Sequence, residues 1–303
     1  NKVEKKHSST SPYDDSMLKH LDSKQTKEYN EKVKQYSKFL SENFGKPTYE
    51  DNGFFIYKQD CLKFLKKYQK INKFKFDLTV TSPPYNIGKE YEEIMSLDEY
   101  IEWSQDWMEL VFNNTSKNGA FWLNLGYLEV NDKGKNVPIS YLIWDKSQFF
   151  LQQEVVWHYG AGVSARKYLS PRNEKWLWYL KNKDDYIFNL DDIRDPNVKY
   201  PNQKKNGKFR VNPLGKNPSD VWIFPKVTSG NKRSSKERTK HPAQFPLKVV
   251  DRIIKGSSNF NEIVLDPFSG SASTGIAASG LKRIYLGIEI KDEYIEESIS
   301  RYE

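Results

Sequence analysis

The feature that most constrains the fold is a buried strand that passes through a tight loop into a helix and then a second strand. Residues 263–266 are apolar up to a final aspartate, as expected of a buried strand. Gly270 permits a sharp turn, and Ser273 or Thr274 is expected to cap the helix that follows. Residues 284–289 form the second strand. Two strands joined by a helix run parallel in one sheet, so an α/β fold is expected.

The loop of this unit can hold a ligand that resembles a nucleoside. A glycine loop at a helix amino end presents backbone N–H groups to a carboxylate or an adenosine. Glu289 ends the second strand about 20 residues later, which is the spacing at which an acid binds a ribose diol. A single glycine loop is also compatible with an ordinary turn, so the loop alone does not establish a cofactor site.

A second strand ends in a rigid loop that carries polar and aromatic groups. Residues 76–80 form a short β-branched and aromatic run, and Pro83 and Pro84 end it because proline cannot donate to a ladder. Ser82 supplies a hydroxyl, and the ring of Tyr85 is expected to be exposed. Both follow the carboxyl end of a strand, where open α/β sheets bind ligands. These groups suit a flat ring that carries an amine.

The two loops together resemble those of the amino-group DNA methyltransferases that use S-adenosylmethionine. The resemblance rests on TSPPY at residues 81–85 and DPFSGSAST at residues 266–274. The catalytic motif precedes the cofactor motif, with a recognition segment between them, which is the order of the β class. Further agreement occurs at residues 59–62, 119–122, 172–177 and 241–246. The similarity covers roughly residues 52–303, apart from a gap at about 199–240.

The resemblance implies a Rossmann-like, doubly wound, mostly parallel sheet with helices on both faces. It implies a catalytic set of Ser82, Pro83, Pro84 and Tyr85, and an S-adenosyl-L-methionine site formed by Asp60, Asp266, Phe268, Gly270, Ser271 and Glu289. In that site Glu289 would hold the ribose hydroxyls and Asp60 would lie near the adenine amine. His241 and Lys248 are candidates for contact with the methionine carboxylate. Ala272 stands where the family usually has a second glycine.

The chain divides into four expected segments. They are an N-terminal helical extension (1–50), a catalytic half (51–198), a basic target-recognition segment (199–240) and a cofactor-binding half (241–303). In the extension, the 3-to-4 spacing of apolar residues predicts a helix over 24–43. Packing of this helix on the outside of the core is favoured over an arm that reaches across DNA.

The recognition segment concentrates the positive charge of the chain. Residues 199–240 hold 12 basic and 2 acidic side chains and carry +10, so the other residues together carry −2 of the total +8. Such a run is often only a solvated loop. Its position between the two halves favours contact with duplex DNA, where basic groups neutralise phosphates and arginines read guanine edges. The candidates are Arg210, Lys232, Arg233 and Arg238.

Composition excludes several other classes. One cysteine permits no internal disulfide, and the four histidines lack metal-ligand spacing, so no metal is expected. Cytosine methylation at ring carbon C5 needs a thiolate in a Pro-Cys loop, whereas Cys61 follows an aspartate and is expected to be a small buried residue. There is neither a membrane-length apolar run nor a signal peptide, so a cytoplasmic protein without membrane contact is expected.

The expected reaction is methyl transfer to the exocyclic N4 amine of a cytosine flipped out of duplex DNA. In the family, serine in the first position of SPPY is usual for N4-cytosine enzymes and aspartate or asparagine for N6-adenine enzymes, so adenine is the alternative. An RNA methyltransferase and an inactive DNA-binding module stay open. A nicotinamide-dependent oxidoreductase is disfavoured because it leaves Ser82 to Tyr85 and the basic segment unexplained. A restriction endonuclease that acts on the same site is a candidate partner.

Overall fold

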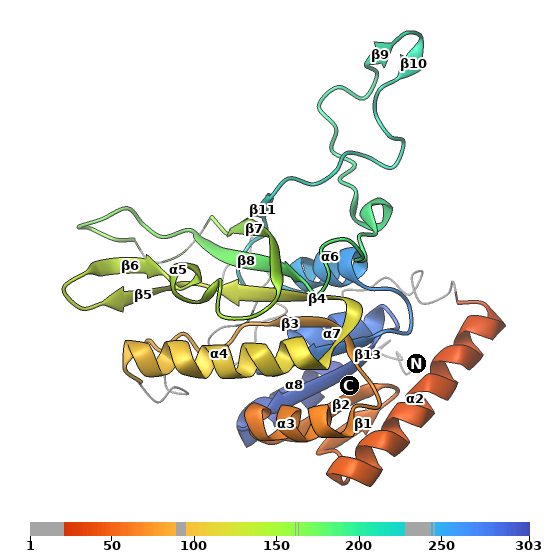
Figure 1. Ribbon diagram of the computed structural model, residues 1–303. Coiled ribbons are helices and arrows are strands. Elements are labelled where there is room, and N and C mark those ends of the chain that lie inside the picture. Colours follow the sequence, from red (N-terminus) through yellow and green to blue (C-terminus); the bar gives the residue numbers. More distant parts are fainter. Residues whose placement is uncertain (1–20, 89–94, 161, 163, 228–243, 245) are drawn as a thin grey trace, which may run out of the picture.

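One mixed sheet organises the molecule (Figure 1). The computed structural model describes residues 21–88, 95–160, 162, 164–227, 244 and 246–303, and nine strands of this part form the sheet. Their order is β1 (Tyr49–Asp51), β2 (Phe54–Lys58), β13 (Ile284–Glu289), β12 (Ile263–Asp266), β3 (Phe76–Thr81), β4 (Thr115–Leu125), β8 (Asn173–Leu180), β7 (Phe150–His158) and β11 (Val221–Ile223). Neighbours from β2 to β4 are parallel, whereas β8 is antiparallel to both its neighbours. The mostly parallel sheet predicted from the sequence is confirmed.

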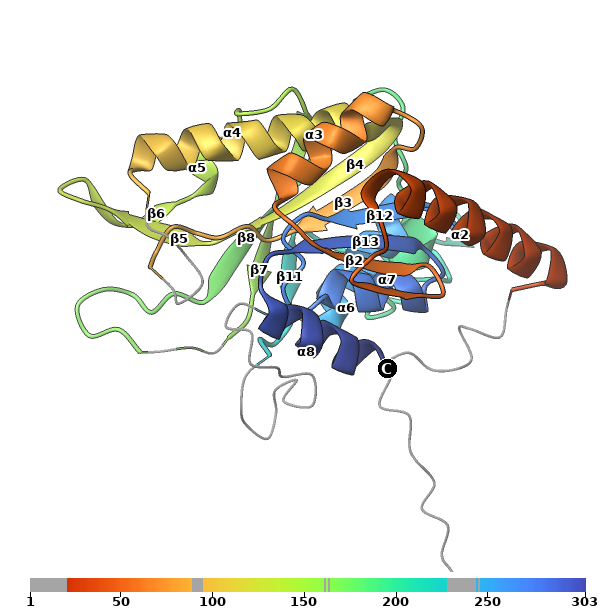
Figure 2. The same cartoon turned by 90° about the horizontal axis from the view of Figure 1, so that it is seen from below.

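Helices cover both faces of the sheet, as predicted (Figure 2). One face carries α2 (Ser23–Phe44), α3 (Cys61–Ile71) and α4 (Leu97–Asn114), and the other carries α6 (Leu247–Ser257), α7 (Ser273–Gly280) and α8 (Asp292–Tyr302). Side chains alternate along β2, so that Phe55 packs into the core under the first group and Phe54 into the core under the second. The shorter elements are β5 (Tyr127–Val130), β6 (Gly134–Pro138), α5 (Ser140–Ile143) and the 3₁₀ turn η1 (Leu190–Ile193).

The N-terminal helix α2 packs on the core, and this prediction is confirmed. Asp22 caps it through a capping box, and Gly45 ends it with φ at 80°. Tyr36 and Phe39 are buried, and the hydroxyl of Tyr36 lies 3.1 Å from that of Tyr68 on α3. The helix therefore extends the hydrophobic core. Residues 1–20 lie outside the described part of the chain.

The chain leaves the sheet as a projecting arm, residues 196–215, which contains β9 (Lys204–Lys205) and β10 (Lys208–Phe209) (Figure 1). Asp195 and Lys216 close its base with a backbone hydrogen bond of 2.9 Å in each direction. Gly215 lies beside this closure with φ at 110°, and a Cβ there would stand 2.3 Å from the carbonyl oxygen of Asp195. Within the predicted segment 199–240, β11 lies in the main sheet beside β7.

Three expectations drawn from composition concern membrane spans, metal ligands and the environment of the single cysteine. No helix in the described ranges is long and apolar enough to cross a membrane. Those same ranges hold no group of three or more potential metal ligands. Cys61 is buried at the start of α3, and burial, followed by the charge of Asp60, raises the pKa of its thiol to about 12. The expectation of a small buried residue at this position is confirmed.

Candidate active site

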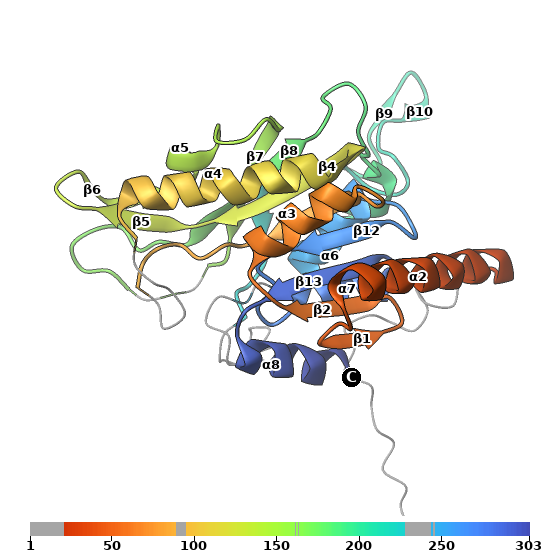
Figure 3. The same cartoon turned by 60° about the horizontal axis from the view of Figure 1, so that its bottom comes forward.

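The loops predicted to form the site meet at the carboxyl edge of the parallel strands (Figure 3). Strands β2, β13, β12 and β3 are consecutive neighbours in the sheet. Asp60, Glu289, Asp266 and Ser82 lie at or just beyond the ends of these four strands. The N–H of Gln59 donates to the carbonyl of Glu289 at 3.0 Å, which joins the first two loops. Residues from distant parts of the sequence therefore occupy one edge.

A buried hydrogen bond joins the predicted catalytic strand to the predicted cofactor loop. The hydroxyl of Thr81 donates to Oδ1 of Asp266 at 2.7 Å, and the N–H of Phe268 donates to the same oxygen at 3.2 Å. Asp266 is 2% exposed. Burial raises the pKa of this carboxyl to about 7, against the opposing effect of the bonds from Thr81 and Phe268. Asp266 thus holds the two loops together at the centre of the edge.

Glu289 holds the glycine loop through its carboxylate. Its Oε2 accepts the N–H of Gly270 at 2.8 Å, and its Oε1 accepts those of Ile290 and Lys291 at 2.9 and 3.0 Å. Burial raises the pKa of Glu289, and these three bonds counteract the rise. An ionised carboxylate has about four acceptor directions. One direction is left for a ligand hydroxyl, which agrees with the ribose-binding role predicted for this residue.

The end of the glycine loop differs from the sequence-based expectation. Ala272, not Ser273 or Thr274, is the N-cap of α7, and no side chain caps the helix. The hydroxyl of Thr274 donates instead to the carbonyl of Val80 at 3.3 Å, because the loop is pressed against β3. Ala272 itself has φ at 56° and ψ at 36°, the left-handed region that favours glycine. This backbone explains why glycine suits the position.

The other residues predicted to bind the cofactor make structural contacts at the same edge. Oγ of Ser271 accepts from Nη1 of Arg301 on α8 at 3.1 Å. The ring of Phe268 packs against Trp103 and Trp107 of α4, with centroids 5.5 and 5.2 Å apart. Asp60 caps α3 by accepting the N–H of Lys63 at 2.9 Å. Each residue is thus held in a fixed place, and its ligand contacts stay a prediction.

Tyr85 is buried, so the prediction of an exposed ring is wrong. The residue is 7% exposed. Its ring lies against Gly126, where a Cβ would stand 2.9 Å from Cε2 of Tyr85. Gly126 follows β4 directly, so the missing side chain leaves the space that the ring fills. The loop before the ring is held as well, because the hydroxyl of Tyr100 on α4 donates to the carbonyl of Pro84 at 2.8 Å.

The hydroxyl of Tyr85 sets the direction of a hydrogen-bond chain. It lies 2.9 Å from Oδ1 of Asn124, and Nδ2 of Asn124 donates to the carbonyl of Lys175 at 3.2 Å. Because Oδ1 can only accept, Tyr85 is the donor in the first pair. Oγ of Ser82 lies 3.1 Å from the Tyr85 oxygen and is therefore the donor in the second. The lone pairs of the Ser82 oxygen stay available as acceptors.

Sequence reasoning missed three residues of this polar cluster: Asn124, Glu174 and Lys226. Oε2 of Glu174 lies 3.4 Å from the Tyr85 oxygen, and Oε1 lies 3.0 Å from Nζ of Lys226. Asn124 offered a signal, because it is a polar residue within the buried second half of β4, residues 119–125. Glu174 offered none beyond its place in a segment similar to the family, and Lys226 was counted only as one charge among the basic residues of 199–240.

Of the residues predicted to contact DNA or the methionine carboxylate, only Arg210 and Lys248 lie in the described part of the chain. Arg210 is exposed on the arm just after β10, and its backbone N–H donates to the carbonyl of Gln203 at 2.9 Å. Lys232, Arg233, Arg238 and His241 lie outside the described residues. Lys248 is exposed in the first turn of α6.

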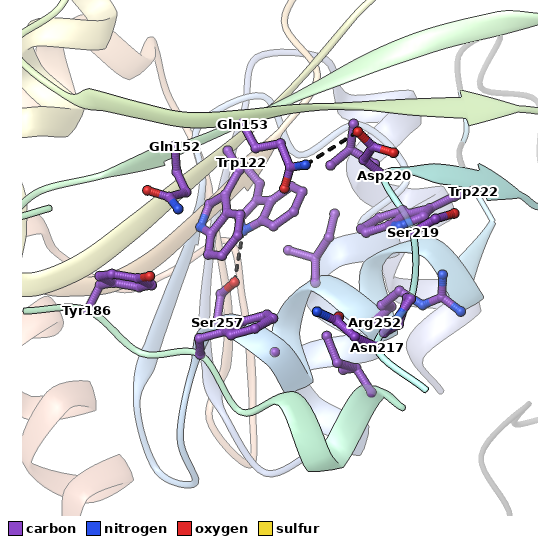
Figure 4. A pocket seen from close by; sticks show the side chains of 17 residues that line it. Trp122, Gln152, Gln153, Tyr186, Asn217, Ser219, Asp220, Trp222, Arg252 and Ser257 are labelled. Atoms are coloured by element: carbon purple, nitrogen blue, oxygen red, sulfur yellow. Dashed lines mark hydrogen bonds between the residues drawn. The ribbon is translucent and has the colours of Figure 1, made fainter. Parts of the chain in front are cut away.

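A cavity of about 440 Å³ lies away from this edge, between the sheet and α6 (Figure 4). Stacked rings of Trp122 and Trp178 form part of its wall, and the indole N–H of Trp122 donates to Oγ of Ser257 at 2.9 Å. Neither the predicted catalytic residues nor the predicted cofactor-binding residues line it. The carboxyl edge of the parallel strands therefore remains the candidate site, since it gathers the predicted groups.

Comparison with known proteins agrees with this geometry. A model of the DNA methylase family, which covers N6 and N4 methyltransferases, matches residues 76–300. The chain is 57% identical over 265 residues to the type II methyltransferase M.ScaI of Streptomyces caespitosus, covering 87% of this chain and 86% of that protein.

Solved structures have the same fold. The cytosine-N4-specific PvuII DNA methyltransferase superimposes with a TM-score of 0.61 at 19% identity, over 82% of this chain and 86% of that one. M1.HpyAVI in complex with S-adenosylmethionine superimposes with a TM-score of 0.54 at 25% identity, over 81% and 97%. With the family match spanning both loops that Thr81 and Asp266 join, this chain belongs to the S-adenosylmethionine-dependent DNA amino-methyltransferases of the restriction-modification type.

Proposed function

We propose that the protein transfers a methyl group to the N4 amine of a cytosine in duplex DNA. The observation that carries this proposal is the hydrogen-bond chain from Ser82 through Tyr85 to Asn124. This chain leaves the Ser82 oxygen as an acceptor for an amine N–H. Serine at this position is the usual form of the N4-cytosine members of the family, and the PvuII enzyme with the similar fold is cytosine-N4-specific.

The residues on the cofactor side fit the charges of S-adenosylmethionine. Its methionine ammonium and its sulfonium are cationic and its ribose hydroxyls are donors, and the edge offers carboxylates at Asp60, Asp266 and Glu289. The free acceptor direction of Glu289 suits one ribose hydroxyl. Gly270, Ser271 and Phe268 would line the methionine part. When bound, the cofactor supplies a methyl group that is activated by the positive sulfur.

The residues on the target side orient a weak nucleophile. The amine lone pair of the base is delocalised into its ring, so the amine must be held in line with the methyl group. The base has to leave the helix stack to reach the loop, which costs a few kcal/mol. The Ser82 hydroxyl oxygen and the carbonyl oxygen of Pro83 then accept hydrogen bonds from the two N–H groups of the amine. Tyr85 contacts the extruded ring, and its tethered hydroxyl fixes the ring plane beforehand.

Duplex DNA is held by the basic groups of the recognition segment. The arm with β9 and β10 projects away from the sheet (Figure 1), and Arg210 directly follows β10 and is exposed to solvent. Lys232, Arg233 and Arg238 complete the proposed set, and their share of affinity decreases as salt rises. The relationship to a type II methyltransferase supports a cognate restriction endonuclease as a partner that acts on the same site.

The test is mass spectrometry of nucleosides from duplex DNA of mixed sequence, incubated with the protein and methyl-labelled S-adenosylmethionine. We expect the label in N4-methylcytosine. Label in N6-methyladenine would replace the cytosine proposal with the adenine alternative. An unlabelled DNA with labelled RNA would identify an RNA methyltransferase, and salt-dependent DNA binding without any label would identify an inactive binding module. The Ser82→Ala variant serves as the control for labelling that depends on this site.

A further inference from the structure

An ion pair lies directly behind the catalytic loop. Glu174 is at the start of β8, and its Oε1 lies 3.0 Å from Nζ of Lys226. Their side chains are 17% and 32% exposed, so the pair is largely shielded from water. Burial favours the neutral form of Lys226, but the charge of Glu174 and the contact with Tyr159 outweigh it and raise the pKa of the ammonium. The ammonium of Lys226 is therefore kept charged in this contact.

The free carboxylate oxygen of this pair competes for the Tyr85 hydroxyl. Oε2 of Glu174 lies 3.4 Å from the Tyr85 oxygen, whereas the amide oxygen of Asn124 lies at 2.9 Å. An ionised carboxylate is a stronger acceptor than an amide. The Tyr85 oxygen nevertheless lies closer to Asn124, and Lys226 balances the charge of Glu174. Without that balance, the buried carboxylate would draw the phenol proton towards itself.

The position of Lys226 links this balance to the recognition segment. The residue comes three positions after β11 and just before residues 228–240, which hold five basic side chains and one acidic one. Its ammonium also lies 3.9 Å from the ring centroid of Tyr159. This contact holds the chain that leaves β11 against the sheet edge. Any shift of the segment at this point changes the distance between Lys226 and Glu174.

We propose that Lys226 is a positioning residue: through Glu174 it makes the orientation of Tyr85 and Ser82 depend on how the recognition segment is seated. The inference rests on the proposed methyl transfer and deepens it. With the ion pair closed, Tyr85 donates to Asn124 and Ser82 presents its lone pairs to the target amine. With the pair open, the Tyr85 oxygen moves towards Glu174, and Ser82, which donates to that oxygen, moves with it away from the target amine.

The test measures the single-turnover rate constant of methyl transfer at saturating DNA and cofactor, with the dissociation constant for DNA measured separately. Lys226→Met should lower the rate constant about 10- to 100-fold, as expected for a misplaced reacting group. Lys226→Arg, which keeps the charge, should restore most of the rate. Glu174→Gln should have a small effect, because a neutral amide does not outcompete Asn124.

The double variant Glu174→Gln with Lys226→Met separates this mechanism from simple loss of a DNA contact. Removing the unpaired carboxylate should return the rate to that of Glu174→Gln alone, whereas a lost DNA contact would leave the double variant as slow as Lys226→Met. Lys255→Met is the matched control, because it opens the Lys255–Asp251 pair, which is 2.9 Å long and similarly shielded. It should leave the rate unchanged, and thermal unfolding checks that each variant is folded.

Two results would overturn the inference. One is a Lys226→Met variant with the wild-type rate constant, and the other is a double variant no faster than Lys226→Met. Both presuppose a wild-type protein that labels DNA. A wild type that leaves DNA unlabelled would remove the proposed function and the inference with it, so the two failures are distinguishable.

Discussion

The cofactor loop and the catalytic loop lie side by side, but they are held in different ways. The cofactor loop is fixed by contacts with backbone N–H groups, such as those of Gly270 and Phe268 with Glu289 and Asp266. The catalytic loop is fixed by side chains from other elements, namely Asn124 on β4 and Tyr100 on α4. Backbone contacts survive many substitutions, whereas a chain of side chains fails at any member. The catalytic side should therefore be the more sensitive to single substitutions, with losses in rate rather than in cofactor affinity.

The largest expected effect is on the catalytic side. Ser82→Ala removes the proposed acceptor for the target amine and should lower the single-turnover rate about 100- to 1,000-fold, as for loss of one preorganised hydrogen-bonding group. The affinities for cofactor and DNA should stay within about twofold, which is measured by calorimetry and by DNA binding in gel shifts. Ser82→Thr retains a hydroxyl and is the control. A Ser82→Ala variant that instead loses cofactor affinity would erase the contrast between the two loops.

The matching substitution on the cofactor side is Glu289→Gln. Its amide keeps one acceptor oxygen but turns an N–H₂ group towards either the N–H of Gly270 or those of Ile290 and Lys291. We expect cofactor affinity to decrease about 10- to 100-fold by calorimetry, in line with loss of charged hydrogen bonds. The rate at saturating cofactor should change much less. If the rate falls while affinity holds, Glu289 belongs to the catalytic side.

The pH dependence of cofactor binding sharpens the same distinction. Burial raises the pKa of Asp266 to about 7, so its carboxyl is ionised above that pH and neutral below it. Since the ionised form favours a cationic ligand, affinity should be greatest above pH 7. It should fall by up to about tenfold for each pH unit below. Asp266→Asn should flatten this profile, apart from the contribution of Glu289, whose pKa is also raised. A wild-type profile that is flat between pH 5 and 8 would contradict the role of Asp266.

The smallest expected effect concerns the strained residue of the cofactor loop. Ala272→Gly relieves a left-handed conformation that costs about 1 kcal/mol, but it loses one buried methyl and adds freedom to the unfolded chain. The free energy of unfolding should therefore change by less than about 1 kcal/mol in urea titration. Ala272→Val should be clearly destabilising, because a β-branched residue fits this backbone poorly. Equal stabilities of all three proteins would mean that the loop carries no strain.

The sequence predicted the fold and the edge well because both follow from local patterns. The short strand-forming runs that end at Thr81, Asp266 and Glu289 can each be found from local sequence, and parallel pairing brings their ends together. Tyr85 was misplaced because its burial depends on Gly126, a residue some 40 positions away with no side chain to suggest a contact. The predicted cap of α7 was wrong because the hydroxyl of Thr274 donates to the carbonyl of Val80 on β3. No local sequence pattern reveals that contact.

The closed base of the arm has a consequence for how such enzymes diversify. Asp195 and Lys216 pair through their backbones, and Gly215 allows the two chains to touch. The two ends of the arm leave and re-enter at the Asp195–Lys216 pair. We therefore expect that length changes within residues 196–215 leave the sheet in place. The arm is therefore expected to tolerate replacement as a unit. We expect that other loops can replace residues 196–215 while β11 and Lys226 stay in place.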